Sequence, residues 1–345
     1  MNPERPFRNI DRAEHLPYDL IDMEAYRATY VEGFPYLSSR GCPHKCAFCH
    51  NLAYNRLSWR RKSPKFVVDE IEQIMKSFSV KKILIHDDDF FVDRRRIEEI
   101  CREIIDRGIR VEFWSQSRYD YASKYTDEFL DLLKRAGFRQ IAFGFESGCG
   151  RVLKFIRKGI TLDQAFMTIR NFARNGVAIV TGFVVGFPTE TWDEIMETLE
   201  VREKIMAMHP NLHVNAVWLY AYLPGTPLYE ISLGYGLQPP ASLDEWGRWS
   251  FGEARLHPWF DKGTVEKLDT ITTLSRYDYA KQYIFSLDRE QRTRKLGGGL
   301  RVALFHLVIG LYGLSARIRW KTRSFSYAWE WKPWIWAFNR FLDRR

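Results

Sequence analysis

The chain has 345 residues, enough for one large α/β domain or for one domain with an extension. Its five cysteines are too few, and odd in number, for a disulfide framework, which favours a reducing cytoplasmic setting over a secreted one. The net charge of +9 is concentrated in residues 291–345, where 12 Lys and Arg face 2 Asp and Glu, so the rest of the chain is close to neutral.

Residues 1–33 are polar and contain proline, so we expect an N-terminal arm or linker there. This segment lacks the apolar core of a signal peptide. From residue 34 to about residue 230, short apolar runs alternate with amphipathic stretches at intervals typical of strand–helix units. The six expected strands lie near residues 34–38, 82–86, 111–115, 140–145, 178–185 and 213–220.

Capping residues mark the starts of the helices between these strands. Asp93 and Thr126 each precede an amphipathic stretch that ends at a glycine, and Thr161 and Thr189 precede two more. The alternation predicts an α/β fold with buried parallel strands. Six units are too few to close an eight-stranded barrel.

The first expected strand leads into three cysteines, Cys42, Cys46 and Cys49, at the spacing C-x3-C-x2-C. Gly41 and Pro43 end the strand, so the thiols should lie on a loop at its carboxyl end. Three thiolates suit zinc or an iron–sulfur cluster. A structural zinc site needs a fourth ligand, and the neighbouring histidines are too close to a cysteine for the usual finger spacing. A non-catalytic zinc or iron–sulfur module is the alternative to an open, reactive cluster.

The later strand ends also carry residues suited to a ligand. The aspartates 87–89 follow the second strand, where a bound cation or the start of a helix would offset their mutual repulsion. Arg118 follows the third strand and can hold a carboxylate through two hydrogen bonds. Gly144 and Glu146 end the fourth strand and Gly186 ends the fifth, and glycines permit close backbone approach.

The cysteine spacing with Phe48 before the third cysteine resembles the signature of the radical S-adenosylmethionine (SAM) superfamily, C-x3-C-x-aromatic-C. The later strand ends are similar to that family over residues 36–229, and most similar to its cobalamin-associated branch of methyltransferases and anaerobic magnesium-protoporphyrin ester cyclase. The resemblance implies a partial (β/α)6 TIM-type barrel, residues 34–230, with a mostly helical C-terminal extension. It implies a 4Fe–4S cluster on the three cysteines and SAM contacts from Phe48, Asp88, Arg118, Gly144, Glu146 and Gly186.

The resemblance further implies an enzyme that reductively cleaves SAM to a 5′-deoxyadenosyl radical and acts on an unactivated C–H bond of a small molecule. A reductant such as flavodoxin or ferredoxin would be its partner. The cobalamin-associated enzymes usually carry a cobalamin-binding domain before the barrel, but only about 35 residues precede it here and no D-x-H-x-x-G motif is present. We therefore expect a chain without that domain or one that takes cobalamin from a partner, and in the latter case methyl transfer is the alternative activity.

Two segments follow the expected barrel, a helical extension at residues 231–296 and a basic, aromatic tail at 297–345, with a break at the glycines 297–299. The apolar run 300–314 is shorter than a bilayer span. With its basic flank and Trp320, Trp329, Trp331, Trp334 and Trp336, the tail suits peripheral contact with a membrane and a lipid-like substrate. A helix packed on the barrel is an equal alternative, and nucleic acid is a weaker one.

Overall fold

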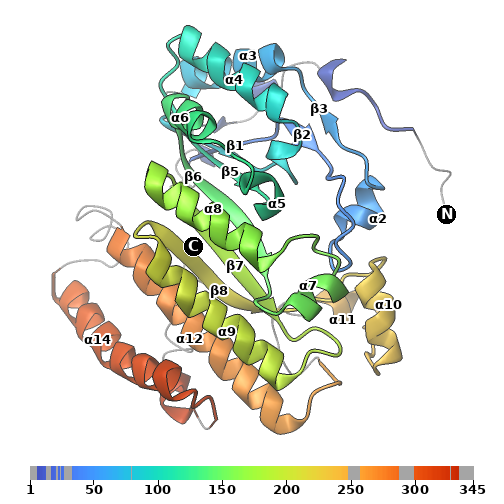
Figure 1. The fold of residues 1–345 in the computed structure, drawn as a ribbon, viewed down its shortest axis with the longest axis vertical. Coiled ribbons are helices and arrows are strands. Elements are labelled where there is room, and N and C mark those ends of the chain that lie inside the picture. Colours follow the sequence, from blue (N-terminus) through green and yellow to red (C-terminus); the bar gives the residue numbers. More distant parts are fainter. Residues whose placement is uncertain are drawn as a thin grey trace.

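The computed structural model describes residues 6–12, 17–20, 22–23, 25–26, 33–78, 80–247, 257–286, 299–326 and 328–333. Much of the expected N-terminal arm lies outside the described residues, as do Gly297, Trp334 and Trp336 of the expected tail. The described residues form a six-stranded sheet, a two-stranded sheet and the helices that pack around them (Figure 1).

The main sheet follows the chain order β1-β4-β5-β6-β7-β8, and every neighbouring pair is parallel. Its strands are β1 (Phe34–Tyr36), β4 (Lys82–Ile85), β5 (Glu112–Ser117), β6 (Phe138–Glu146), β7 (Ala178–Val185) and β8 (Leu212–Leu219). All six strands lie where the sequence predicts them. This order, with a helix between successive strands, confirms the α/β partial barrel, and it brings all the carboxyl strand ends to one edge.

Helices connect successive strands and cover the outer side of the sheet. The longer ones are α3 (Pro64–Phe78), α4 (Arg94–Asp106), α6 (Asp127–Arg135), α8 (Leu162–Asn175) and α9 (Trp192–Met208). Short helices are η1 (Ile10–Arg12), η2 (Tyr18–Leu20), α2 (Asn51–Asn55), η3 (Phe90–Val92), α5 (Tyr119–Ala122), α7 (Gly150–Phe155), α10 (Pro227–Gly234) and α11 (Leu243–Gly247).

The predicted caps explain where most of these helices begin. Asp93, Thr126 and Thr161 each accept a hydrogen bond from the backbone two or three residues into α4, α6 and α8. The prediction that Thr189 opens a helix is wrong. Thr191 caps α9 instead, in a capping box with Glu194, and Thr189 lies just outside the helix with φ of +69°.

The two faces of the sheet differ in burial. Along β7 the side chains alternate between fully buried and half-buried, and the buried set, which includes Ile179, Phe183 and Val185, packs beneath the helices. The other face is the concave side of the partial barrel. It stays more open, and Trp218 of β8 is 48% exposed there. The sheet therefore presents an accessible inner wall above which the strand ends converge.

A small two-stranded sheet closes the first loop of the barrel. Residues 39–40 form β2 and residues 60–61 form β3, and the two pair antiparallel. We call this pair the strand clasp. The segment between its strands contains all three motif cysteines, so the clasp holds the two ends of the cysteine loop together.

The C-terminal extension packs on the side of the barrel that ends with β8. Helix α12 (Lys262–Ser286) contacts β8, and α14 (Gly299–Thr322) lies beyond it at the outer edge of the molecule (Figure 1). Trp320 and Trp331 are buried in this packing. The sequence suggested that these tryptophans contact a membrane interface. Because they are buried, they cannot do so. Among the described residues, no helix is both long and apolar enough to cross a bilayer.

Candidate functional site

The three motif cysteines lie on the loop that follows β1 and β2, at the carboxyl edge of the main sheet. Cys46 is buried, and Cys42 and Cys49 are half-buried. Gly41 begins the loop with φ of +89°, and an added Cβ there would lie 1.9 Å from the carbonyl oxygen of Ser58. Only glycine therefore allows the chain to enter the loop in this conformation.

Contacts across the barrel fix the middle of the cysteine loop. The Ala47 amide donates to the Ile156 carbonyl at 2.8 Å, and the Leu228 amide donates to the Ala47 carbonyl at 3.0 Å. Phe48 is half-buried, with its ring centroid 6.2 Å from that of Phe187, the residue after Gly186. The aromatic residue of the motif thus packs against the end of the fifth strand of the main sheet.

The three adjacent aspartates have separate roles. Asp87 is buried and accepts hydrogen bonds from the Ser38 amide at 2.6 Å and from the hydroxyls of Ser38 and Ser39. Burial raises the pKa of Asp87, and these hydrogen bonds partly offset that rise. Asp88 is exposed and accepts from the Gly41 amide at 2.8 Å. Two of the acids therefore hold the start of the cysteine loop.

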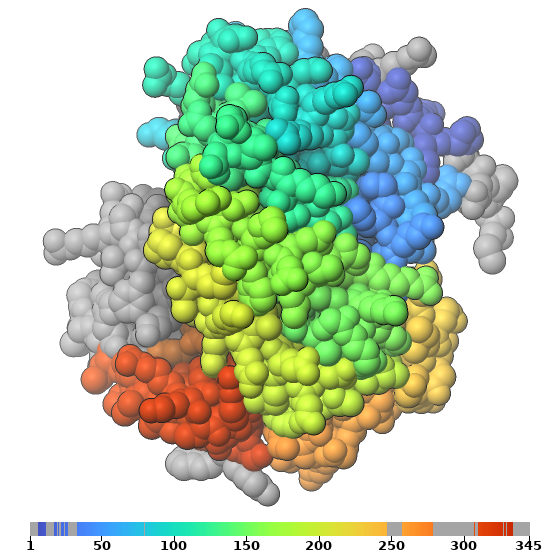
Figure 2. All heavy atoms as spheres, in the orientation of Figure 1, coloured from blue at the N-terminus to red at the C-terminus, as the bar shows by residue number. Residues whose placement is uncertain are grey.

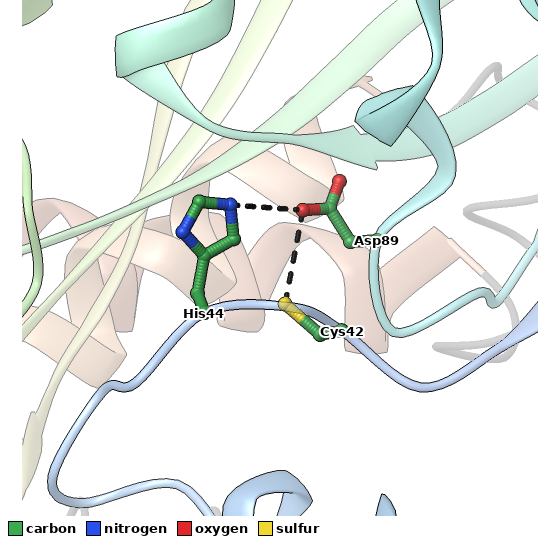
Figure 3. Close-up of side chains that lie close together, drawn as sticks. All are labelled: Cys42, His44 and Asp89. Carbon is green, nitrogen blue, oxygen red and sulfur yellow. Dashed lines mark hydrogen bonds and ion pairs between the residues drawn. The ribbon is translucent and has the colours of Figure 1, made fainter. Parts of the chain in front are cut away.

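The third aspartate faces the cysteine loop directly (Figure 3). Asp89 Oδ2 lies 3.8 Å from Cys42 Sγ and 3.8 Å from His44 Nε2, and the three ligand atoms lie within 4.8 Å of one another. Burial raises the pKa of Asp89 to about 7, and its Oδ1 atom is buried with no hydrogen-bond partner among the described residues. Burial lowers the pKa of His44 to about 4, and its ring contacts the Tyr121 hydroxyl. Neither His44 nor Tyr121 is among the site residues that the sequence predicts.

Arg118 joins the cysteine loop to two other segments. It is 7% exposed, and its Nη1 atom lies 3.6 Å from Cys46 Sγ. Its Nη2 donates to the Lys158 carbonyl at 2.6 Å, and its Nε donates to Asp120 Oδ1 at 2.9 Å. Arg118 is predicted to hold a carboxylate through two hydrogen bonds, and in the structure it binds the Asp120 carboxylate through one.

A buried ion pair lies at the end of β6. Lys158 Nζ is 2.7 Å from Glu146 Oε1, and the two side chains are 9% and 13% exposed. Glu146 has φ of +67°, and Gly144 makes room for the pair, because an added Cβ would lie 2.2 Å from Glu146 Oε1. The Lys158 ammonium also lies 5.9 Å from the Phe48 ring centroid. Lys158 is not among the predicted site residues because it lies in a loop rather than at a strand end.

Gly186 at the end of β7 is held by a second buried acid. It has φ of +89°, and its amide and that of Phe187 both donate to Glu190 Oε2, at 2.6 and 3.0 Å. The Gly186 carbonyl accepts from Trp259 Nε1 at 3.2 Å. Burial raises the pKa of Glu190 to about 8, although these two amides lower it in part. The turn after β7 is thus fixed from both sides.

The predicted site residues therefore form one contiguous group at the carboxyl edge. Contacts run from Cys46 through Arg118 to Lys158, and from Lys158 to Glu146 and Phe48. Burial raises the pKa values of the Cys42 and Cys49 thiols, and the proximity of Cys46 adds to both shifts. All three thiols come from one short loop, as the shared ligands of one soft-metal centre can. The donor set fits an iron–sulfur cluster better than a four-ligand zinc site.

The two remaining cysteines lie apart from this group. Cys101 is buried in α4, and Cys149 is buried just before α7, with its sulfur 3.6 Å from Glu194 Oε1. Their surroundings agree with a packing role.

Comparison with known proteins supports the same assignment. The radical SAM superfamily profile matches residues 36–201. The chain is 28% identical over 236 residues to an uncharacterised methyltransferase of Pyrococcus horikoshii, covering 68% of this chain and 50% of that protein. It is 26% identical over 306 residues to the anaerobic magnesium-protoporphyrin IX monomethyl ester cyclase of Rubrivivax gelatinosus, covering 85% of this chain and 52% of that protein. The chain thus spans about half the length of these curated relatives.

Solved structures share the fold. The cobalamin-dependent SAM radical enzyme OxsB, with aqua-cobalamin and SAM bound, aligns with a TM-score of 0.60 at 18% identity, over 79% of this chain and 46% of that one. The superfamily match falls on a partial barrel with three cysteines beyond its first strand, so the chain is similar to radical SAM proteins in this region. The curated proteins that it resembles thus include a methyltransferase and a cyclase.

Proposed function

We propose that this chain binds a 4Fe–4S cluster through Cys42, Cys46 and Cys49, cleaves SAM reductively, and acts on an unactivated C–H bond of a small molecule. The observation that carries the proposal is the chain of contacts from Cys46 through Arg118 to the buried Lys158–Glu146 pair. The cluster, when bound, supplies the electron that splits SAM into methionine and a 5′-deoxyadenosyl radical. The protein binds, orients and shields the reactants.

The Lys158–Glu146 pair suits the amino-acid end of SAM. That end carries one ammonium and one carboxylate. Lys158 and Glu146 carry the same two kinds of charged group and neutralise each other in the structure. We propose that Glu146 binds the ammonium and that Lys158, with Arg118, binds the carboxylate. Because both side chains are largely buried from water, charge-assisted hydrogen bonds from them to SAM would be strong. Asp88 keeps Gly41 in place beside this end of the ligand.

The turn after β7 suits the other end of SAM. This segment is similar to the one that borders adenine in the family, and Gly186 permits close approach of its backbone. Glu190 fixes the turn through the amides of Gly186 and Phe187. Phe48 and Phe187 form an apolar wall that would exclude water from the reacting atoms.

The open inner wall of the barrel suits a small, largely apolar substrate. Trp218 of β8 is 48% exposed, and the Trp114 ring on β5 lies 5.4 Å from the His86 ring, centroid to centroid. Large aromatic surfaces favour apolar or planar ligands. We expect a reductant such as flavodoxin or ferredoxin to supply electrons from outside the barrel.

Methyl transfer with cobalamin from a partner is the second candidate. The names of several relatives favour it, among them cytidylyl-2-hydroxyethylphosphonate methyltransferase and hopanoid C-3 methylase. Whether this chain binds cobalamin by itself is tested by mixing the purified chain with cobalamin and separating bound from free by gel filtration. Retention of one cobalamin per chain favours methyl transfer by this chain alone, and no retention favours C–H chemistry without cobalamin or a partner that supplies it.

The proposal is tested by anaerobic reconstitution with iron and sulfide. The loaded chain should absorb at about 400 nm, as other iron–sulfur clusters do, and dithionite should bleach this absorbance. The loaded chain should also release 5′-deoxyadenosine from SAM. Cys46→Ala should abolish absorbance and release. Cys149→Ala, a buried cysteine outside the loop, is the matched control and should retain both. A colourless protein with one tightly bound zinc, or normal release by Cys46→Ala, would overturn the proposal.

A further inference from the structure

Helix α14 has two apolar faces, and only one of them is used for packing. On the inner face, Gly313, Ala316 and Trp320 are buried. The outer face carries large apolar side chains that recur every three or four residues and so lie in one line along the helix. We call these residues the α14 stripe; they are Leu307, Leu311, Leu314 and Ile318, exposed by 60%, 65%, 60% and 53%.

The inner face accounts for how α14 is held on the barrel. Trp320 donates from Nε1 to Asp278 Oδ2 of α12 at 3.1 Å, and the Arg202 guanidinium of α9 lies 4.7 Å from its ring centroid. Trp331 packs against Tyr277 and Tyr312. The α14 stripe takes no part in these contacts, and the helix forms part of the outer surface (Figure 2, red). Four aligned, exposed aliphatic residues on a surface helix mark an interaction site.

The charge on α14 indicates the chemistry of the missing partner. The helix contains four Arg or Lys residues and no Asp or Glu. Arg319 is paired with Glu330, but Arg317 and Lys321 are exposed and have no acidic partner within the described part of the chain. Lys321 follows Ile318 by three residues and therefore lies beside the stripe. The stripe is thus flanked by uncompensated positive charge, within the segment 291–345 whose balance is +10.

We propose that α14 docks the protein on an anionic lipid surface. The helix lies flat, with the α14 stripe in the boundary between headgroups and acyl chains and with Arg317 and Lys321 at the lipid phosphates. A second copy of the chain fits this face poorly. A twofold contact would bring the same basic, acid-free helix against itself, so like charges would oppose each other.

Vesicle co-sedimentation of the full chain tests the proposal, with no SAM present, so its outcome is independent of the proposed chemistry. Vesicles of equal parts phosphatidylcholine and phosphatidylglycerol should bind the protein at low salt, and pure phosphatidylcholine vesicles should bind it weakly. The double variant Leu311→Ser with Leu314→Ser should weaken binding by about tenfold or more, because two leucine side chains would no longer bury apolar area in the lipid. Arg317→Glu with Lys321→Glu should weaken it by about thirtyfold or more and remove most of its salt dependence.

Matched controls separate docking from general effects of mutation. Leu243→Ser changes an 89% exposed leucine on α11, and Arg95→Glu with Arg110→Glu changes two exposed arginines elsewhere, so neither variant should alter binding. Equal binding to neutral and anionic vesicles, or normal binding by the stripe variant, would overturn the proposal. So would a wild-type dimer that ignores vesicles and becomes a monomer when Leu311 and Leu314 are replaced, since the stripe would then face a second copy.

Discussion

The carboxyl edge of the barrel and helix α14 depart from the usual inside–outside rule in opposite directions. At the carboxyl edge, Glu146, Lys158 and Asp89 are largely buried although they are charged or polar. On α14, the leucines of the stripe are exposed although they are apolar. Each arrangement costs stability, by desolvation of charge in one region and by hydration of apolar surface in the other. Side chains whose placement does not serve folding therefore indicate where a ligand is expected, a charged one at the barrel edge and a lipid surface at α14.

The largest effect should come from breaking the buried charge pair. Lys158→Met leaves Glu146 buried without its partner and should cost about 4 kcal/mol of unfolding free energy, and it should abolish 5′-deoxyadenosine release. Urea unfolding of the cluster-free chain measures the first effect. Adding Glu146→Gln should recover part of the stability and none of the activity. A cost near zero for the single change would mean that the pair is solvated.

The two faces of α14 can be compared directly by truncation. Trp320→Ala removes a buried ring together with its contacts to Arg202 and Asp278, and it should cost about 3 kcal/mol. Leu311→Ala, on the exposed face of the same helix, should change stability by less than about 0.5 kcal/mol. Thermal unfolding of both variants tests the contrast. Equal costs would show that the stripe is part of the folded core.

A smaller effect is expected from filling the space beside the charge pair. Gly144→Ala places a methyl group against Glu146 and Lys158, so it should cost about 2 kcal/mol and weaken SAM binding. Gly182→Ala on the neighbouring strand is the matched control, because its nearest neighbour would be Asn215 Cβ at 3.8 Å. Calorimetric titration with SAM distinguishes the two. Full SAM affinity in Gly144→Ala would place the ligand away from this pair.

A change in pH dependence is expected from the buried acid after β7. The pKa of Glu190 is raised from 4.5 to about 8 by burial, so the folded chain binds this proton more tightly than the unfolded chain. The contribution of Glu190 to stability is therefore present below pH 4.5 and falls as pH rises toward 8. Glu190→Gln keeps an acceptor for the Gly186 and Phe187 amides but does not titrate. Its melting temperature should decline less between these pH values, and a parallel decline would show that Glu190 is ionised throughout.

The strands and the site edge could be predicted because they depend on local sequence. Apolar runs at βα spacing identify the strands, and special residues that follow each run identify the edge where they meet. The start of α9 was predicted at Thr189 although Thr191 has the stronger signal, since Glu194 follows it by three residues in a capping box.

Contacts between distant segments could not be predicted from local pattern. Lys158 lies in a loop, and its pairing with Glu146 depends on how α7 turns back over the sheet. Trp320 and Trp331 share a basic, aromatic composition with membrane-facing segments, and their burial depends on the packing of α9 and α12. The sequence shows the residues of the α14 stripe only as part of one apolar run. Which of them are exposed also depends on how α14 packs on the neighbouring helices.

The strand clasp has a consequence for the assembly of the metal centre. By pairing β2 with β3, it joins the two ends of the segment that holds Cys42, Cys46 and Cys49 through contacts of the protein's own backbone. Closing a free loop of roughly twenty residues costs about 3 kcal/mol in chain entropy. Folding has already met this cost, so the thiols should capture a cluster roughly a hundredfold more tightly than the same segment as a free peptide.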